Sequence, residues 1–196
     1  MAASALLISA CATREPRPVG AWLEQRADWF ERHPEWSLSG RVGLSDGQRG
    51  GSLSFHWRAS VDHHRIDLRT TTGGKRWQLE FGPHVAILEG SDIDRLVGTE
   101  PDPLVEAAVG WPIPVAALAW WIRGLPGGHE ERAVFAPDGT LEQILGDDWR
   151  LVYQRFEEVN GQLMPARMQA TSGEYRVRLA LREWRWAAMK NEKSLY

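Results

Sequence analysis

From residue 36 to residue 186 the sequence consists mainly of short runs in which apolar and polar residues alternate. The clearest run is 175–182, where Val177, Leu179 and Leu181 alternate with arginines. Successive side chains of a β-strand point to opposite faces, so each such run predicts a strand with one apolar and one polar face. We count about eleven of these runs, separated by Gly-rich turns, which favours a single antiparallel sheet.

Two stretches break the alternation and predict helices. Residues 19–34 have helical spacing of their aromatic and leucine residues, and Pro34 ends the pattern. Residues 102–128 are rich in Ala, Leu and Pro and predict two short helices, at about 103–109 and 114–123. Glycines follow both expected helices at positions suited to end them.

These elements predict a mainly β (α+β) fold in one domain, since 196 residues can bury a core without metals or disulfides. An antiparallel sheet of about eleven strands with one apolar face is expected to curl into a barrel or an unclosed barrel. The two internal helices would then cover the concave side. A barrel of more than eight strands is wider than its own side chains can fill, so we expect a hydrophobic cavity.

The N-terminus contains the only cysteine of the chain, Cys11, which therefore cannot form an internal disulfide. Three interpretations remain, an inert residue, a nucleophile or a modified residue, and the sequence before Cys11 favours modification. Residues 2–10 are small and apolar like the core of a secretory signal, and the four residues ISAC (8–11) resemble the lipobox of bacterial lipoproteins. We predict a signal peptide over 1–10, a lipidated tether over 11–18, the folded domain over 19–186 and a tail over 187–196.

The sequence gives little support for catalysis or for nucleic-acid binding. The net charge is −3 and the pI about 6.1, without the basic excess typical of nucleic-acid binders. His63 and His64 are neighbours on an expected strand and would point to opposite faces, which disfavours a shared metal. The same reasoning applies to Asp147 and Asp148, a weak candidate for a paired-carboxylate site.

The apolar face is the candidate binding site. The 11 Trp against 3 Tyr and 5 Phe, and the adjacent Trp120 and Trp121 between Gly110 and Gly124, favour a cavity for a lipid or acyl chain, with plain core packing as the alternative. The predicted cavity lining is Leu53, Phe55, Trp57, Ile66, Leu68, Trp77, Leu79, Phe81, Leu118, Trp121, Ile122, Val152, Leu179 and Leu181.

Residues 110–127 (GWPIPVAALAWWIRGLPG) resemble the LolB family of outer-membrane lipoproteins, as do LSGRVGL at 38–44, DWRLVYQRF at 148–156 and MPARM at 164–168. The resemblance implies an unclosed barrel of eleven strands, helices over the opening, no catalysis and no cofactor or metal. It implies that acyl chains of cargo lipoproteins pass from the periplasmic carrier LolA into this cavity and then into outer-membrane phospholipid. Ala12 after the lipobox cysteine agrees with a lipid anchor in the outer membrane, facing the periplasm.

One segment departs from the family pattern. Family members carry an apolar residue on a protruding loop after the third strand, and the matching loop here is 69–76 (RTTTGGKR), with Thr72 at the expected membrane-insertion position. No leucine is present there, so either a neighbouring Trp has that role or insertion works differently. The alternative function is a membrane-tethered structural or hydrophobic-ligand-binding module unrelated to lipoprotein sorting.

Overall fold

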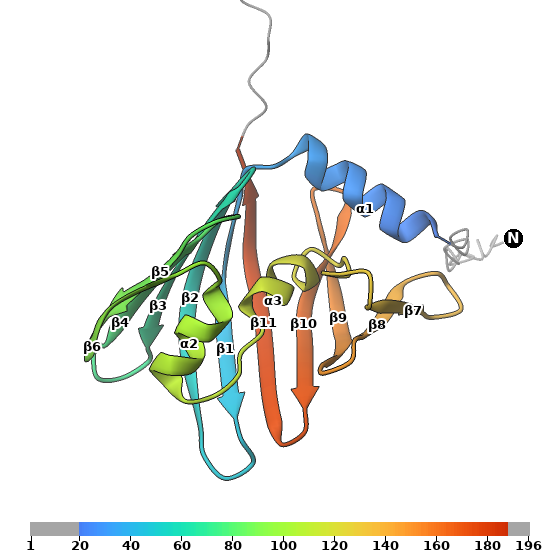
Figure 1. Ribbon diagram of the computed structural model, residues 1–196. Coiled ribbons are helices and arrows are strands. Elements are labelled where there is room, and N and C mark those ends of the chain that lie inside the picture. The colour runs from blue at the N-terminus through green and yellow to red at the C-terminus, as the bar shows by residue number, and fades with distance from the viewer. Residues whose placement is uncertain (1–19, 188–196) are drawn as a thin grey trace, which may run out of the picture.

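The computed structural model describes residues 20–187. It contains one sheet of eleven strands and three helices, as Figure 1 shows. The elements are α1 (Ala21–Arg32), β1 (Trp36–Ser45), β2 (Gly50–Ser60), β3 (His63–Thr70), β4 (Arg76–Phe81), β5 (Ala86–Gly90), β6 (Ile93–Gly98), α2 (Pro101–Val109), α3 (Val115–Trp121), β7 (Arg132–Phe135), β8 (Leu141–Leu145), β9 (Arg150–Val159), β10 (Gln162–Ser172) and β11 (Tyr175–Trp186). The predicted signal peptide, the tether with Cys11, and the tail beyond residue 187 lie outside the described residues.

The sheet is antiparallel and does not close. Its strand order is β6-β5-β4-β3-β2-β1-β11-β10-β9-β8-β7, so the first and last strands of the chain pair in the middle and β6 and β7 form the two edges. The predicted unclosed barrel of eleven strands is therefore confirmed. The pairing of β1 with β11 joins a half built from β2–β6 to a half built from β7–β10.

Strand register gathers the apolar residues on one face. Leu38 of β1 lies opposite Trp57 of β2, which lies opposite Ile66 of β3, which in turn lies opposite Leu79 of β4. Directly paired residues share a face, and all four of these side chains are buried. On the other face the neighbours are polar, as in the pair of Arg58 with Asp67. The period of two in the sequence thus gives the concave, apolar side and the convex, polar side of the sheet.

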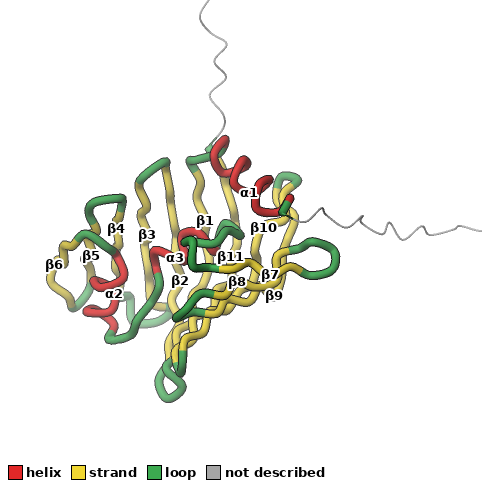
Figure 2. The backbone as a smooth tube through the Cα atoms, turned by 45° about the vertical axis from the view of Figure 1, so that its right-hand side comes forward, coloured by secondary structure: helices red, strands yellow, loops and turns green. Residues whose placement is uncertain are grey.

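The helices cover the concave side, as Figures 1 and 2 show for α2 and α3. Helix α2 begins at Pro101, whose fixed φ suits a first turn, and ends at Gly110 with a left-handed φ of 75°. Helix α3 ends at Trp121, before the turn that contains Gly124. Both predicted helices are confirmed, with α2 beginning two residues earlier and α3 ending two residues earlier than expected.

Helix α1 lies along one end of the sheet and contributes a strongly aromatic contact. Trp22 and Phe30 are buried on its inner side, and the Trp22 Nε1 donates a hydrogen bond of 3.0 Å to the carbonyl of Gly124. Phe30 packs edge-on against Trp36 at the start of β1. Within residues 20–187 no helix combines the length and apolar character needed to cross a bilayer.

Candidate functional site

A wholly apolar pocket lies between the sheet and the covering helices. Its volume is about 90 Å³. It is lined by Val42, Leu44, Leu53, Phe55, Trp57, Ile66, Leu68, Leu79, Val105, Val109, Ile113, Val115, Leu118 and Leu179. A site without a polar group on its wall offers no hydrogen bond or charge to a ligand, so it selects for hydrocarbon.

Strands β1–β4 and β11 form the wall of this apolar pocket through consecutive cross-strand pairs. Leu179 of β11 lies opposite Val42 of β1, and Val42 lies opposite Leu53 of β2. Phe55 is accommodated because its neighbour on β1 is Gly40, where a Cβ would come within 2.7 Å of the phenyl ring. Register therefore decides which of the apolar strand residues reach the pocket.

Helices α2 and α3 form the cover of the apolar pocket. Val105 and Val109 lie one turn apart on α2, and Val115 and Leu118 lie one turn apart on α3. The two helices are joined by the Asp102 carboxylate, which accepts a hydrogen bond of 2.9 Å from the backbone N–H of Ala116. Burial raises the pKa of Asp102 above its ordinary value, against the lowering effect of this hydrogen bond.

Eight of the fourteen predicted lining residues border the apolar pocket: Leu53, Phe55, Trp57, Ile66, Leu68, Leu79, Leu118 and Leu179. Trp77 and Leu181 share the concave face, because they lie opposite Leu68 and Gly40, but they lie outside the pocket. Phe81 borders a different hollow, described below.

Two further predicted lining residues, Trp121 and Ile122, fill space instead of bordering it. Trp121 is 1% exposed and Ile122 is completely buried. The Trp121 Nε1 donates to both carboxylate oxygens of Glu131, at 3.1 and 2.9 Å, and its backbone carbonyl accepts a hydrogen bond of 2.7 Å from the Tyr153 hydroxyl. Trp121 and Ile122 therefore do not line the apolar pocket, contrary to the prediction. These contacts hold Trp121 on the side of α3 that faces β9.

The assignment of Val152 to the cavity is wrong. Val152 lies opposite Gln143 of β8 and Gln169 of β10, which places it on the convex, polar face. Its neighbours Leu151 and Tyr153 are the buried residues of β9. The sequence around Val152 is apolar at three consecutive positions, so alternation alone did not define the inward parity.

Six residues that line the apolar pocket were not predicted. Val42 and Leu44 alternate with polar or small residues in β1, and their place beside Leu179 depends on the β1–β11 register. Val105, Val109, Ile113 and Val115 belong to the covering helices and their connection. The spacing of Val105 and Val109 by one helical turn could have predicted these two residues from the sequence.

A larger hollow of about 700 Å³ lies at the end of the sheet next to α1, and we call it the Arg123 hollow. Its wall includes Phe30, His64, Phe81, Trp120 and Arg123. The Arg123 guanidinium lies 4.3 Å from the centroid of the Trp120 ring and 5.5 Å from that of Phe30. The hollow is therefore mixed in character, with aromatic walls and one cation.

Burial shifts the pKa values of two groups in the wall of the Arg123 hollow, Arg123 and His64. Burial lowers the pKa of Arg123 to about 10, which leaves it protonated at neutral pH. Burial, followed by the charges of Arg123 and His63, lowers the pKa of His64 to about 4. His64 is therefore neutral near pH 7, and its Nδ1 accepts a hydrogen bond of 3.1 Å from the Trp57 Nε1, which places the ring proton on Nε2.

The residues considered for catalysis or metal binding do not form a site. His63 is exposed, whereas His64 lies opposite Phe81 on the concave face, so the two histidines point apart as predicted. Asp147 and Asp148 lie in the turn between β8 and β9, which corrects their expected place on a strand. Across residues 20–187, no group of three or more His, Cys, Asp and Glu side chains is placed to hold a metal ion.

Thr72 lies in the exposed turn between β3 and β4. Gly73 and Gly74 follow it with φ of 91° and 69°, and the Thr70 N–H donates to the Lys75 carbonyl to close the turn. The loop is thus a tight hairpin turn, and a role for Thr72 at the membrane stays a prediction.

An open curled sheet with an apolar pocket under two helices defines the class of unclosed β-barrel proteins. A LolA superfamily protein from Nitrosomonas europaea has this fold, with a TM-score of 0.50, 6% identity, and coverage of 90% of this chain and 97% of that one. A putative outer membrane lipoprotein-sorting protein domain from Vibrio parahaemolyticus also has a TM-score of 0.50, with 8% identity, covering 87% of this chain and 94% of that one.

Sequence comparison identifies the family within this class. The family model described as "Outer membrane lipoprotein LolB" matches residues 34–184. The outer-membrane lipoprotein LolB of Alkalilimnicola ehrlichii is 36% identical over 92% of each chain, and that of Tolumonas auensis is 27% identical over 93% of each. The chain belongs to the LolB family. It is a lipid-anchored outer-membrane protein that faces the periplasm and acts in lipoprotein localisation.

Proposed function

We propose that this protein accepts lipoproteins from the carrier LolA by taking their acyl chains into the apolar pocket, and then passes them into the outer membrane. The observation that supports this most directly is the wholly apolar lining of the pocket, shared between the sheet and two short helices. We further propose that lipidated Cys11 is the anchor and that the process requires no catalysis. The family to which the chain belongs supports the same reading.

The energetics of such a transfer depend on differences between binding sites. Burial of an acyl chain stabilises by about 0.8 kcal/mol per CH₂ wherever the chain is buried, so carrier, receiver and bilayer all bind strongly. A difference of about 1.4 kcal/mol between carrier and receiver already gives a tenfold bias. The anchor keeps the receiver beside the bilayer, the final acceptor, and so raises its effective concentration there.

The apolar pocket must widen to take an acyl chain. Its volume of about 90 Å³ is below the range of about 300–1,000 Å³ typical of ligand pockets. The covering side is the side that can move, because α2 and α3 are short, Gly110 with its positive φ lies between them, and they are joined by hydrogen bonds from the backbone N–H groups of Val115 and Ala116 to Asp102. We propose that α2 and the first turn of α3 move away from the sheet when an acyl chain enters, while Trp121 holds the other end of α3 in place.

The test fills the apolar pocket from its strand wall. Val42→Phe adds a ring beside Leu179 and Leu53, and we expect at least a tenfold loss of affinity for a fluorescent acyl probe, with a matching loss of lipoprotein transfer from loaded LolA. Val152→Phe is the matched control, since it makes the same change on the convex face of the same sheet.

Two results would contradict the proposal. Unchanged probe binding and transfer in Val42→Phe would exclude the apolar pocket as the acyl site. Probe uptake by the wild-type protein without any acceptance of lipoprotein from loaded LolA would instead identify a hydrophobic-ligand-binding module.

A further inference from the structure

The convex side of the sheet carries a set of arginines that acidic residues do not balance. In the segments 37–45, 150–155, 167–171 and 176–182, every charged residue is an arginine, although the chain as a whole has a net charge of −3. All of these arginines are exposed. We call them the convex arginine face: Arg41, Arg150, Arg155, Arg167, Arg176, Arg178 and Arg182.

Strand register aligns part of this face in a row. Arg41 of β1 lies opposite Ala180 of β11, Ala180 lies opposite Arg167 of β10, and Arg167 lies directly opposite Arg155 of β9. Like charges in directly opposed positions destabilise a sheet. Arg155 forms an ion pair with Glu157, so Arg167 is the member of this pair that has no carboxylate partner in the described chain, and a bound anion would supply one.

The row continues on the other side of β1. Arg41 lies opposite Ser54 of β2, Ser54 lies opposite Arg69 of β3, and Arg69 lies directly opposite Arg76 of β4. This is a second pair of directly opposed arginines in the same row. The row thus crosses the convex side from β4 to β9.

The neighbouring rows on β2–β4 show how the same sheet balances its charges elsewhere. There Arg58 forms an ion pair of 2.8 Å with Asp67, and Arg65 forms one of 2.9 Å with Glu80. In the convex arginine face, only Arg155 has an ion pair within the described part of the chain, with Glu157. The absence of carboxylates therefore holds for the segments 37–45, 150–155, 167–171 and 176–182, and the acidic residues of β9 and β11 lie nearer the ends of those strands.

We propose that the convex arginine face binds the phosphate groups of anionic phospholipids in the periplasmic leaflet of the outer membrane. The protein is a lipid-anchored member of its family, and only residues 12–19 separate Cys11 from Gly20 at the start of the described domain. A chain of that length spans at most about 30 Å, so the domain stays within reach of the bilayer. Guanidinium groups bind phosphate oxygens in a bidentate manner, and a basic patch is a common second signal beside a lipid anchor.

Binding through this face fixes the orientation of the domain. The convex arginine face and the covering helices α2 and α3 lie on opposite sides of the sheet. Contact with the bilayer through the arginines therefore turns the helices and the apolar pocket towards the periplasm. This inference depends on the outer-membrane location and not on acyl-chain binding.

The experiment uses the full chain with Cys11→Ser, which removes the lipid anchor, and co-flotation with vesicles. Phosphatidylcholine vesicles with 0% or about 30% phosphatidylglycerol provide the neutral and anionic surfaces. The test variant is Arg41→Gln, Arg167→Gln and Arg176→Gln together, three residues without an ion pair or a side-chain hydrogen bond in the described part of the chain. The matched control is Arg58→Gln, Lys75→Gln and Arg95→Gln, which removes the same charge from three ion-paired positions.

We expect the Cys11→Ser protein to bind the anionic vesicles more strongly than the neutral ones and to be released as salt is raised. Each arginine near an anionic surface contributes about a fivefold gain in partition, so the test variant should lose about 100-fold and the control much less. Unfolding curves of both variants check that the fold is retained. Equal binding to both vesicle types, or equal losses in the two variants, would overturn the proposal.

An acidic protein partner is the competing occupant of the convex arginine face. If the wild-type protein ignored anionic vesicles but bound immobilised polyglutamate, and the test variant lost that binding, the membrane assignment would be wrong. A spin label at Thr171→Cys on the convex side provides a further check of orientation. On vesicles it should become protected from an aqueous relaxation agent, while a label at His129→Cys between α3 and β7 should not.

Discussion

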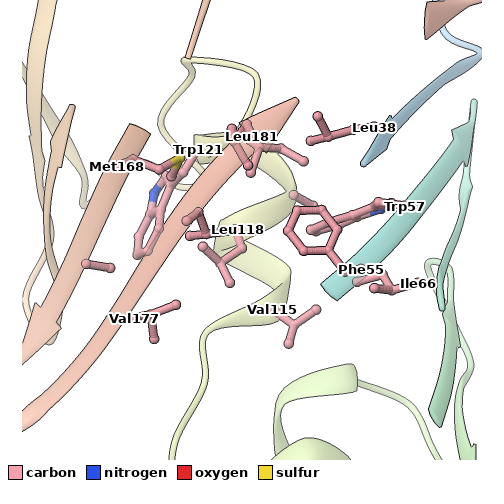
Figure 3. Packing of buried hydrophobic residues seen from close by; sticks show 14 of the residues in the cluster. Leu38, Phe55, Trp57, Ile66, Val115, Leu118, Trp121, Met168, Val177 and Leu181 are labelled. Carbon is pink, nitrogen blue, oxygen red and sulfur yellow. The ribbon is translucent and has the colours of Figure 1, made fainter. Parts of the chain in front are cut away.

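Both halves of the concave side present apolar residues, but one half borders a pocket and the other half is filled by side chains. On β1–β4, the strand residues and the helical residues opposite them leave the apolar pocket between them. On β8–β10, Leu141, Ile144, Leu151 and Met168 are all at most 1% exposed, and Trp121 fills the space above them. Figure 3 shows the contrast, with Trp121 and Met168 on one side of α3 and Phe55, Trp57 and Ile66 on the other.

The difference arises from what α3 presents to each half. Towards β1–β4 it presents Val115 and Leu118, which are too short to reach all of the strand residues opposite. Towards β8–β10 it presents Trp121, which also holds Glu131 and Tyr153 through hydrogen bonds. The size of the side chains that cover an apolar face therefore determines whether that face borders a pocket or belongs to a filled core.

Removing the side chain that fills the β8–β10 half should reduce stability more than any other change proposed here. Trp121→Ala should reduce the free energy of unfolding by about 3–5 kcal/mol, because it removes a buried ring and leaves a cavity. The neighbouring Trp120, which is 43% exposed, supplies the control, and Trp120→Ala should cost less than about 1 kcal/mol. Urea unfolding measures both. A similar loss in the two variants would show that the filled half is not the stabilising one.

His64 lies at the end of the half that contains the apolar pocket, and its pKa makes the stability of the protein depend on pH. Its pKa is about 4 in the folded protein and 6.5 ordinarily, so between pH 6.5 and pH 4 the unfolded chain binds the additional proton. Its contribution to stability is therefore fully present above pH 6.5 and is lost as the pH falls towards 4, by about 2 kcal/mol after allowance for partial exposure.

The pH effect is measured by urea unfolding at pH 7.5 and at pH 4.5. His64→Gln keeps an acceptor for the Trp57 Nε1 and should be less sensitive to this change of pH than the wild type. His63→Gln, on the exposed face, should keep the wild-type dependence. An unchanged pH dependence in His64→Gln would show that His64 is not the group responsible.

Tyr153→Phe gives the smallest expected change. It deletes the hydroxyl that donates to the Trp121 carbonyl but keeps the ring that stacks on Phe156. The loss should be about 1 kcal/mol in the free energy of unfolding, the usual value for one buried neutral hydrogen bond. Binding of the acyl probe should not change, since Tyr153 belongs to the filled half; a weakened binding would show that the two halves are coupled through α3.

The fold was largely predictable because its signals are local in the sequence. Alternation of apolar and polar residues indicates the strands, and the glycines and Pro34 indicate where the helices end. The candidate site was predictable only in part, since its lining depends on contacts between distant segments. Val42 borders the pocket because β1 pairs with β11, an alignment that connects residues more than a hundred positions apart. Val152 was misplaced because residues 151–153 are all apolar, and the partners Met168 and Ala170 on β10 decide which of them point inwards.

The sheet has two free edges, and this has a mechanical consequence. In the described chain, β6 and β7 end the sheet at opposite sides and do not pair with each other. A closed barrel can change its radius only by breaking or shifting its ladder of backbone bonds. This open sheet can change its curvature with every interstrand bond kept, so it can follow a movement of the covering helices by elastic bending.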